Sequence, residues 1–181
     1  STPAQASQQL QAYRALTRKP LNINLFCHQP PQVDAQREAD WLAWLQPHFQ
    51  ALGAQVPANL RSPYQSFLEG NDWLQWALDE RPEVLSFHFG LPNAEAIEQL
   101  KAAGIILLGC ATRVNEAQAI VDAQLDGAIV QGVEAGGHRG CFNPAQGDSA
   151  LTTADLLGLC RERFDLPLIA AGGIMTGADW R

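Results

Sequence analysis

Short apolar segments recur between stretches of helical periodicity, and this rhythm most constrains the fold. Strand-like segments start near residues 84, 105 and 127, each about one strand-plus-helix unit after the last. Segments that are apolar nearly throughout are typical of parallel strands whose two faces are both covered. Together with two further segments, five strands are expected: 21–26, 84–89, 105–108, 127–131 and 167–171. The sequence therefore predicts an α/β protein with a parallel sheet.

The segments between the strands carry apolar residues at the three- to four-residue spacing of helices. Helices are expected at about 4–17, 34–52, 93–104, 113–125 and 152–164, and in the second half of 62–82. Pro47 is expected to interrupt or kink its helix, because proline lacks an amide hydrogen. Gly104 should end one helix, and Thr152 or Thr153 should begin the last.

Four of the five strands end in polar or glycine-rich residues: Asn24, His88, Gln131, and Gly172 with Gly173. In a TIM-type (β/α)8 barrel the site lies at these carboxyl ends, whereas a doubly wound open sheet binds ligands only around a switch point. The barrel is therefore favoured. Five strands do not close it, the chain opens without methionine, and it stops at "GADWR", where a helix should begin. We expect residues 1–181 to be part of a barrel domain whose N- and C-terminal parts are missing, with a helical excursion at about 30–82.

Composition argues against several functional classes. Twelve basic and nineteen acidic residues give a net charge of −7, which disfavours binding to nucleic acid or an anionic membrane. No apolar run approaches a membrane span and no signal-peptide pattern opens the chain, so a cytoplasmic protein is expected. The four cysteines form no CxxC pair and are expected to be reduced thiols. His138 and Cys141 lack a third ligand at suitable spacing, so no metal site is expected.

The segment "GAIVQGVEAGGHRG", residues 127–140, is a strand followed by a glycine-rich loop that carries a histidine and an arginine. The side-chain amide of Gln131 can donate to and accept from a planar heterocycle. Gly136 and Gly137 leave room for a flat ligand against the backbone. His138 extends from the loop, where an imidazole can serve as a base near neutral pH.

Other interpretations of these residues stay open. His138 and Arg139 can be solvated loop residues with Glu134 as the partner of Arg139. The double glycine at 172–173, before a helix expected near Thr176, can bind a phosphate through backbone amides or form a tight turn. His88 can be a core residue or line a site.

Two further features are left open in the same way. Alternation places Asn22 and Asn24 on one face of the first strand, toward the barrel interior or away from it. Four tryptophans of the excursion can pack helices or roof the pocket: Trp41, Trp44, Trp73 and Trp76.

The segments "NINLF", "SFHFGLP", "GAIVQGVEAGGHRG" and "PLIAAGGI" occur in this order, and together they resemble the nitronate monooxygenase family, formerly called 2-nitropropane dioxygenases. The resemblance runs from about Ser1 to Met175. The element "EAGGHRG" is its most specific part, whereas "AAGGI" is shared with many phosphate-binding barrels. Flavin-type enoyl-acyl-carrier-protein reductases have a similar loop, and "SFHFGLP" favours the monooxygenases.

The resemblance implies a barrel that holds FMN non-covalently, with His138 as the catalytic base and His88 in the substrate pocket. The predicted cofactor-binding residues are Asn24, Gln131, Gly136, Gly137, Gly172 and Gly173. The implied reaction oxidises an alkyl nitronate with O₂ to a carbonyl compound and nitrite, and His138 would remove the α-proton of a neutral nitroalkane. A homo-oligomer is left open.

Two alternative functions remain at this stage. One is an FMN-dependent NAD(P)H reductase of enoyl thioesters or quinones. The other is a flavin-free phosphate-binding barrel or ligand-binding module. An inactive fragment is a third alternative.

Overall fold

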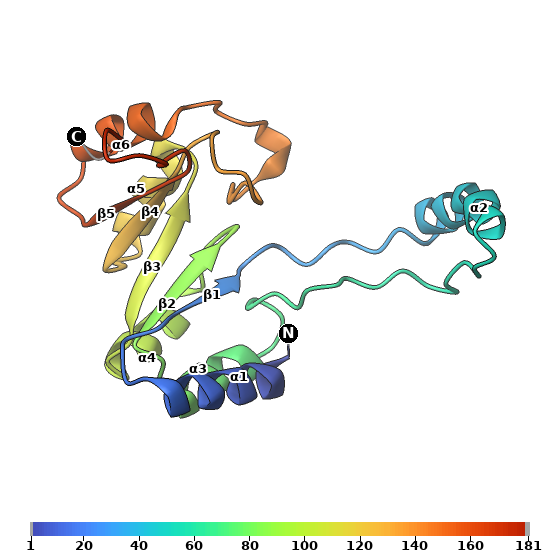
Figure 1. Cartoon of the computed structure of the whole chain (residues 1–181), viewed down its shortest axis with the longest axis horizontal. Helices are drawn as coiled ribbons and strands as arrows, with labels where there is room; N and C mark the ends of the chain where they lie inside the picture. Colours follow the sequence, from blue (N-terminus) through green and yellow to red (C-terminus); the bar gives the residue numbers. More distant parts are fainter. Residues whose placement is uncertain (1, 180–181) are drawn as a thin grey trace.

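The computed structural model describes residues 2–179, which contain one sheet of five parallel strands (Figure 1). The strands are β1 (Asn22–Phe26), β2 (Val84–His88), β3 (Ile106–Ala111), β4 (Gly127–Gln131) and β5 (Leu168–Ala171). Their order in the sheet is their order in the chain, and every pair is parallel. The predicted parallel α/β fold is confirmed. The described strands have no switch point, so the arrangement is that of part of a (β/α) barrel and not of a doubly wound sheet.

Six α-helices accompany the strands within residues 2–179: α1 (Pro3–Leu16), α2 (Ala35–Ala51), α3 (Asp72–Glu80), α4 (Ala94–Ala102), α5 (Val114–Asp122) and α6 (Thr153–Arg161). Helix α2 continues through Pro47, so a predicted interruption there is wrong, and a kink at Pro47 stays a prediction. Residues 177–179 form a turn where a helix was expected. None of the helices in the described residues has the length and apolarity needed to cross a membrane.

Local side-chain chemistry explains where several helices begin and end. The Thr152 hydroxyl accepts a hydrogen bond from the Asp155 amide and begins α6, and the Asn93 side chain does the same for the Ala96 amide in α4. Gly104 follows the end of α4 with φ of 81°, a left-handed conformation that glycine adopts without strain. Both predicted signals are therefore confirmed.

The two faces of the sheet differ in burial. One row across the outer face consists of Leu25, Phe87, Gly109, Ala128 and Leu168, and it lies under the helices. The Phe87 and Ala128 side chains are fully buried in this row. On the opposite face, Ile106 and Ile169 stay about half exposed. The main hydrophobic core therefore lies between the sheet and the helices on its outer face, and burial of each large side chain there contributes roughly 1.5–3 kcal/mol.

The excursion between β1 and β2 contains two different helices. Helix α3 packs on α1 and α4 and buries Trp73 and Trp76. Helix α2 stands away from the sheet on two extended segments and has no buried residue (Figure 1). Trp41 and Trp44 stack on this helix with ring centroids 4.7 Å apart, and both are about half exposed. Only the second pair of tryptophans therefore packs helices within the described chain.

Gly109 provides a test of the packing between β3 and α5. A Cβ atom at this position would lie 2.5 Å from Cγ1 of Ile120, whose side chain is fully buried. We expect Gly109→Ala to lower the free energy of unfolding by about 1–3 kcal/mol, because overpacking forces strain into the core. Urea denaturation measures the effect.

Gly158 supplies the matched control for this substitution. It lies on an exposed position of α6 with no atom within 4 Å of a built Cβ. Gly158→Ala should raise the free energy of unfolding by about 0.5–1 kcal/mol through helix propensity. Equal stability of the two variants would contradict the packing described here.

Candidate active site

The sequence-predicted site residues all lie at the carboxyl edge of the sheet. Pairing puts Phe26 beside His88, and Gln131 beside Ala171, so the exits of β1, β2, β4 and β5 meet there. The loops after β4 and β5 carry the glycines and His138 to the same edge. Asn24 lies two residues before the end of β1, on the face of the strand that also carries Asn22. The parallel register therefore brings together residues that are up to 149 positions apart in the chain.

Aromatic rings gather at this edge and form a cluster, here called the rim cluster: Phe26, His28, Tyr64, His88, Phe89 and His138. The ring of Phe26 is central, with the centroids of Phe89 and Tyr64 at 4.9 and 5.4 Å. The His138 ring is exposed, and its centroid lies 6.2 Å from that of Phe26 and 5.9 Å from that of Phe89. The imidazole therefore borders on an aromatic surface while one side stays accessible.

A strained turn at the end of β2 places Phe89 in this cluster. Phe89 has φ of 68°, a left-handed conformation that is rare for a bulky residue. The next residue, Gly90, passes so close to β1 that a Cβ would lie 2.7 Å from the Cys27 carbonyl oxygen. The chain therefore turns sharply here, and only glycine fits at position 90.

His88 supports the loop that carries His138. Its Nε2 lies 3.3 Å from the His138 carbonyl oxygen, and since a carbonyl only accepts, Nε2 carries the hydrogen in this bond. Burial lowers the pKa of His88 and thereby favours the neutral ring. Gly140 lies against the same ring and against Cys110, whose pKa is raised by burial to about 12. Cys110 is therefore a protonated thiol and no nucleophile.

Gln131 holds the backbone on both sides of residue 139. Its side-chain nitrogen donates to the His138 carbonyl oxygen at 2.9 Å, and its oxygen accepts from the Gly140 amide at 2.7 Å. The residue is almost fully buried. Both ends of the predicted ligand-binding amide are thus engaged within the loop, and a contact between Gln131 and a cofactor stays a prediction.

Arg139 closes the base of the loop. Its guanidinium donates to the carbonyl oxygens of Gln131 and Gly132 at 2.8 and 2.6 Å. It also binds both carboxylate oxygens of Asp148, at 2.7 and 2.9 Å. The hydrogen bond from Arg139 lowers the pKa of Asp148 to about 2. Arg139 therefore pairs with Asp148, and the interpretation of Glu134 as its partner is wrong.

Glu134 instead joins the loop to the start of α6. Its carboxylate accepts from the amide and the hydroxyl of Thr153 at 2.9 and 3.0 Å. The backbone hydrogen bonds, the largest cause, lower the pKa of Glu134. The carboxylate thus occupies the N-terminus of α6, where the helix dipole favours a negative charge.

The double glycine after β5 packs against the loop after β4. Gly172 and Gly173 have φ of 111° and 71°. A Cβ on Gly172 would lie 2.7 Å from the Ala135 nitrogen, so the two loops touch backbone to backbone. Gly136 and Gly137 differ, since nothing lies within 4 Å of a Cβ built on either. Their backbone faces open space.

Glu116 is a buried carboxylate that sequence reasoning missed. It accepts hydrogen bonds from the amide and hydroxyl of Thr112 at 2.7 and 2.9 Å, and from the Phe142 amide at 2.8 Å. The Arg113 guanidinium lies 3.8 Å from it. Glu116 therefore ties the start of α5 to the far side of the loop. The Thr112 contact is local, but no local pattern marks the contact with Phe142, because the two residues are 26 positions apart.

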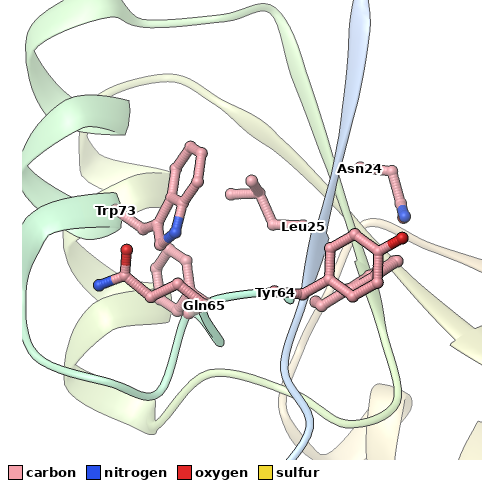
Figure 2. A pocket seen from close by; sticks show the side chains of 7 residues that line it. Asn24, Leu25, Tyr64, Gln65 and Trp73 are labelled. Carbon is pink, nitrogen blue, oxygen red and sulfur yellow. The ribbon is translucent and has the colours of Figure 1, made fainter. Parts of the chain in front are cut away.

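Two pockets flank the rim cluster. One, of about 500 Å³, lies between His28, Phe89, Arg139 and the segment 141–144. The other, of about 200 Å³, lies beside β1 and is lined by Asn24, Leu25, Phe26, Tyr64, Gln65, Phe67 and Trp73 (Figure 2). Phe26 lines the smaller pocket and Phe89 the larger one, and the His138 ring lies beside both of these rings. The arrangement provides an apolar, aromatic surface with an accessible imidazole beside it.

Comparisons of the sequence with known proteins point to one family. The sequence profile of the family described as nitronate monooxygenase matches residues 1–180. A nitronate monooxygenase of Paraburkholderia phytofirmans is 52% identical over 165 residues, which cover 91% of this chain and 45% of the relative. One of Pseudomonas aeruginosa is 48% identical over 168 residues, covering 93% and 48%. The chain spans about half the length of these relatives.

Solved structures are similar as well. A nitroalkane oxidase from Streptomyces ansochromogenes superposes with a TM-score of 0.82 at 33% identity, over 98% of this chain and 50% of that one. FabK from Thermotoga maritima superposes with a TM-score of 0.65 at 22% identity, over 99% and 42%, a similarity of fold alone.

Glu116 provides a test of how the loop is held. In Glu116→Gln the side chain presents an NH₂ group toward one of the three donors that the carboxylate accepts, so at least one buried hydrogen bond is lost. We expect a loss of about 1–3 kcal/mol in the free energy of unfolding and faster hydrogen exchange at the Phe142 amide. Glu98→Gln, on the exposed face of α4, is the control and should change neither quantity. Unchanged exchange at Phe142 would contradict the described role.

Proposed function

The chain belongs to the nitronate monooxygenase family, and from this premise we propose that it forms part of a flavin-dependent enzyme that oxidises alkyl nitronates with O₂ to carbonyl compounds and nitrite. The family is one of flavoenzymes. The observation that carries the proposal is the accessible His138 imidazole beside Phe26 and Phe89, on a loop whose backbone is fixed on either side.

The glycine-rich edge fits FMN. Gly136 and Gly137 expose backbone with no side chain of residues 2–179 above it, and Gly173 lies in the adjoining turn. The amides of these three glycines donate to no atom of residues 2–179. Such free amides are the donors that a phosphate or a flavin ring requires. In this proposal Gly136 and Gly137 leave room for FMN against the backbone, Gly172 and Gly173 bind its phosphate, and Asn24 contacts the ring system from β1.

His138 serves as the base in this proposal. A general base must reach the carbon-bound proton of its substrate, and a loop residue with an exposed ring does so without displacing core side chains. Its carbonyl oxygen is held by Gln131 and His88, so the backbone stays in place while the ring is free to take up a proton. FMN supplies the electron transfer to oxygen when it is bound.

In this proposal the rim cluster orients the substrate and excludes water from it. Phe26, Phe89 and Tyr64 offer flat apolar surfaces on which a small alkyl nitronate can lie, and they reduce the water around the reacting carbon. His88 lies against Phe26 and Phe89 of this rim as a neutral ring, with its Nε2–H directed at the His138 carbonyl oxygen. We place the substrate in the pocket of about 500 Å³ beside Phe89.

The proposal extends to the protein as a whole. Residues 2–179 form part of an FMN-binding barrel domain, and the excursion at about 30–82 belongs to that domain. The partners are a nitronate or nitroalkane and O₂. The enzyme acts in the cytoplasm.

An absorbance spectrum followed by a nitrite assay tests the function. Protein purified under conditions that retain flavin should show the visible absorbance of a bound flavin and should release nitrite from an alkyl nitronate in air. A colourless protein that releases no nitrite would favour a flavin-free phosphate-binding barrel. Rapid anaerobic reduction by NAD(P)H without nitrite formation would replace the proposal by a reductase.

His138→Ala tests the assignment of the base. Activity on a neutral nitroalkane should fall by roughly 10²–10⁴-fold, whereas activity on the preformed nitronate should fall much less, because the nitronate has already lost its proton. Steady-state nitrite release with both forms of one substrate gives the comparison. His48→Ala on α2 is the control histidine, since it lies outside the rim cluster. Equal loss with both substrate forms would remove the assignment.

A further inference from the structure

Three polar side chains form a directed hydrogen-bond chain on the inner face of the sheet. The Asn22 side-chain nitrogen donates to the Ser86 hydroxyl oxygen at 3.1 Å, and the Ser86 hydroxyl donates to Asn24 Oδ1 at 2.9 Å. The register pairs Asn24 with Ser86 on the neighbouring strand, so β1 and β2 themselves set this contact.

The hydrogen bonds among Asn22, Ser86 and Asn24 run in a fixed direction. A serine hydroxyl has a single hydrogen, and here that hydrogen is used toward Asn24, while the oxygen accepts from Asn22. Ser86 is only 1% exposed, so water does not readily replace either partner. The carbonyl oxygen of the Asn24 amide is therefore directed at Ser86, and the NH₂ end is the part that points away from Ser86 and can face a ligand.

Asn24 presents this NH₂ group to the pocket beside β1. The residue is exposed and lines the pocket together with Phe26 and Tyr64. In Figure 2 the amide nitrogen of Asn24 is turned toward the side on which the Tyr64 ring lies. Among residues 2–179 the Asn24 side chain makes no hydrogen bond other than the one from Ser86. Both of its N–H groups are thus available.

We propose that Ser86 is a positioning residue that holds Asn24 so that its side chain offers donors, and no acceptor, to the bound flavin. The inference rests on the proposed function in that the ligand is FMN. Asn24 would then donate to an oxygen or an unprotonated nitrogen of the cofactor and would not accept from an N–H group of its ring. Asn22 supports Ser86 from the other side.

Because the hydrogen bonds have this direction, substitutions of Asn24 and Ser86 should change FMN affinity in different ways. Asn24→Asp keeps an acceptor for the Ser86 hydroxyl and has no N–H, so it should weaken FMN binding as much as Asn24→Ala does. Ser86→Ala frees the Asn24 amide to rotate, and a lost hydrogen bond of about 0.5–1.5 kcal/mol corresponds to roughly 2–12-fold weaker binding. Ser86→Thr keeps the hydroxyl and should restore most of the affinity.

Titration of the apoprotein with FMN, followed by flavin fluorescence and by the visible spectrum, measures these effects. Ser7→Ala is the control, because it also removes a hydroxyl that takes part in a hydrogen bond, from Trp76, but lies on α1. It should leave FMN affinity and the flavin spectrum unchanged. A circular dichroism spectrum verifies that each variant is folded, and Asn24→Asp, at an exposed position, keeps the test decisive if Ser86→Ala does not fold.

Slower exchange of the one Asn22 side-chain N–H that is bonded to Ser86, compared with the side-chain N–H groups of Asn24, provides a readout that does not involve the cofactor. Ser86→Ala should abolish the difference. Undiminished FMN affinity in Asn24→Asp would overturn the inference, and so would unchanged affinity in Ser86→Ala when Asn24→Ala binds weakly. A wild-type protein that binds no FMN would contradict the proposed function itself, and the exchange measurement would still decide the orientation of Asn24.

Discussion

The in-register parallel pairing of strands that follow one another in the chain is the constraint on which the site depends. Because chain neighbours are sheet neighbours, every strand ends at the same edge, and Phe26 lies beside His88 as Gln131 lies beside Ala171. The helices bury the side chains on the outer face of the sheet, such as that of Phe87. The inner face and the carboxyl edge are thus relieved of forming the main core, and polar side chains such as that of Asn24 can be placed there.

The loop from Gly132 to Thr152 combines many glycines with a defined backbone. Glycine raises the entropy lost on ordering a loop, so such a segment needs fixed points. The structure provides these through side chains that bind backbone groups: Gln131 at the centre, Arg139 at the base and Glu116 at the far side. None of these contacts uses the His138 ring. The backbone is therefore held while the imidazole, among residues 2–179, keeps both nitrogens free of hydrogen bonds.

Sequence pattern located the strands to within three residues and placed the glycines, His88 and His138 at one edge, because apolar runs and turn residues are local signals. Pairing between strands is not local, so Ser86 was missed although Asn22 and Asn24 were correctly assigned to one face. Pro47 shows that a local signal can also mislead, because the helix does not end there. In a helix with no buried residue, water can satisfy the carbonyl that a proline leaves unpaired, and the helix continues.

Of the three histidines in the rim cluster, His88 and His138 lie closest to the loop after β4, and their surroundings differ. His88 is half-buried, its Nε2–H is directed at the His138 carbonyl oxygen, and burial lowers its pKa. A proton added to His88 would place a charge in a site that disfavours it, next to a second imidazole. The His138 ring has the same aromatic neighbours, but it is exposed and makes no hydrogen bond with the described residues, so a proton taken from a substrate can pass on to water. The structure thus supports His138 as the proposed base and His88 as the group that holds its loop.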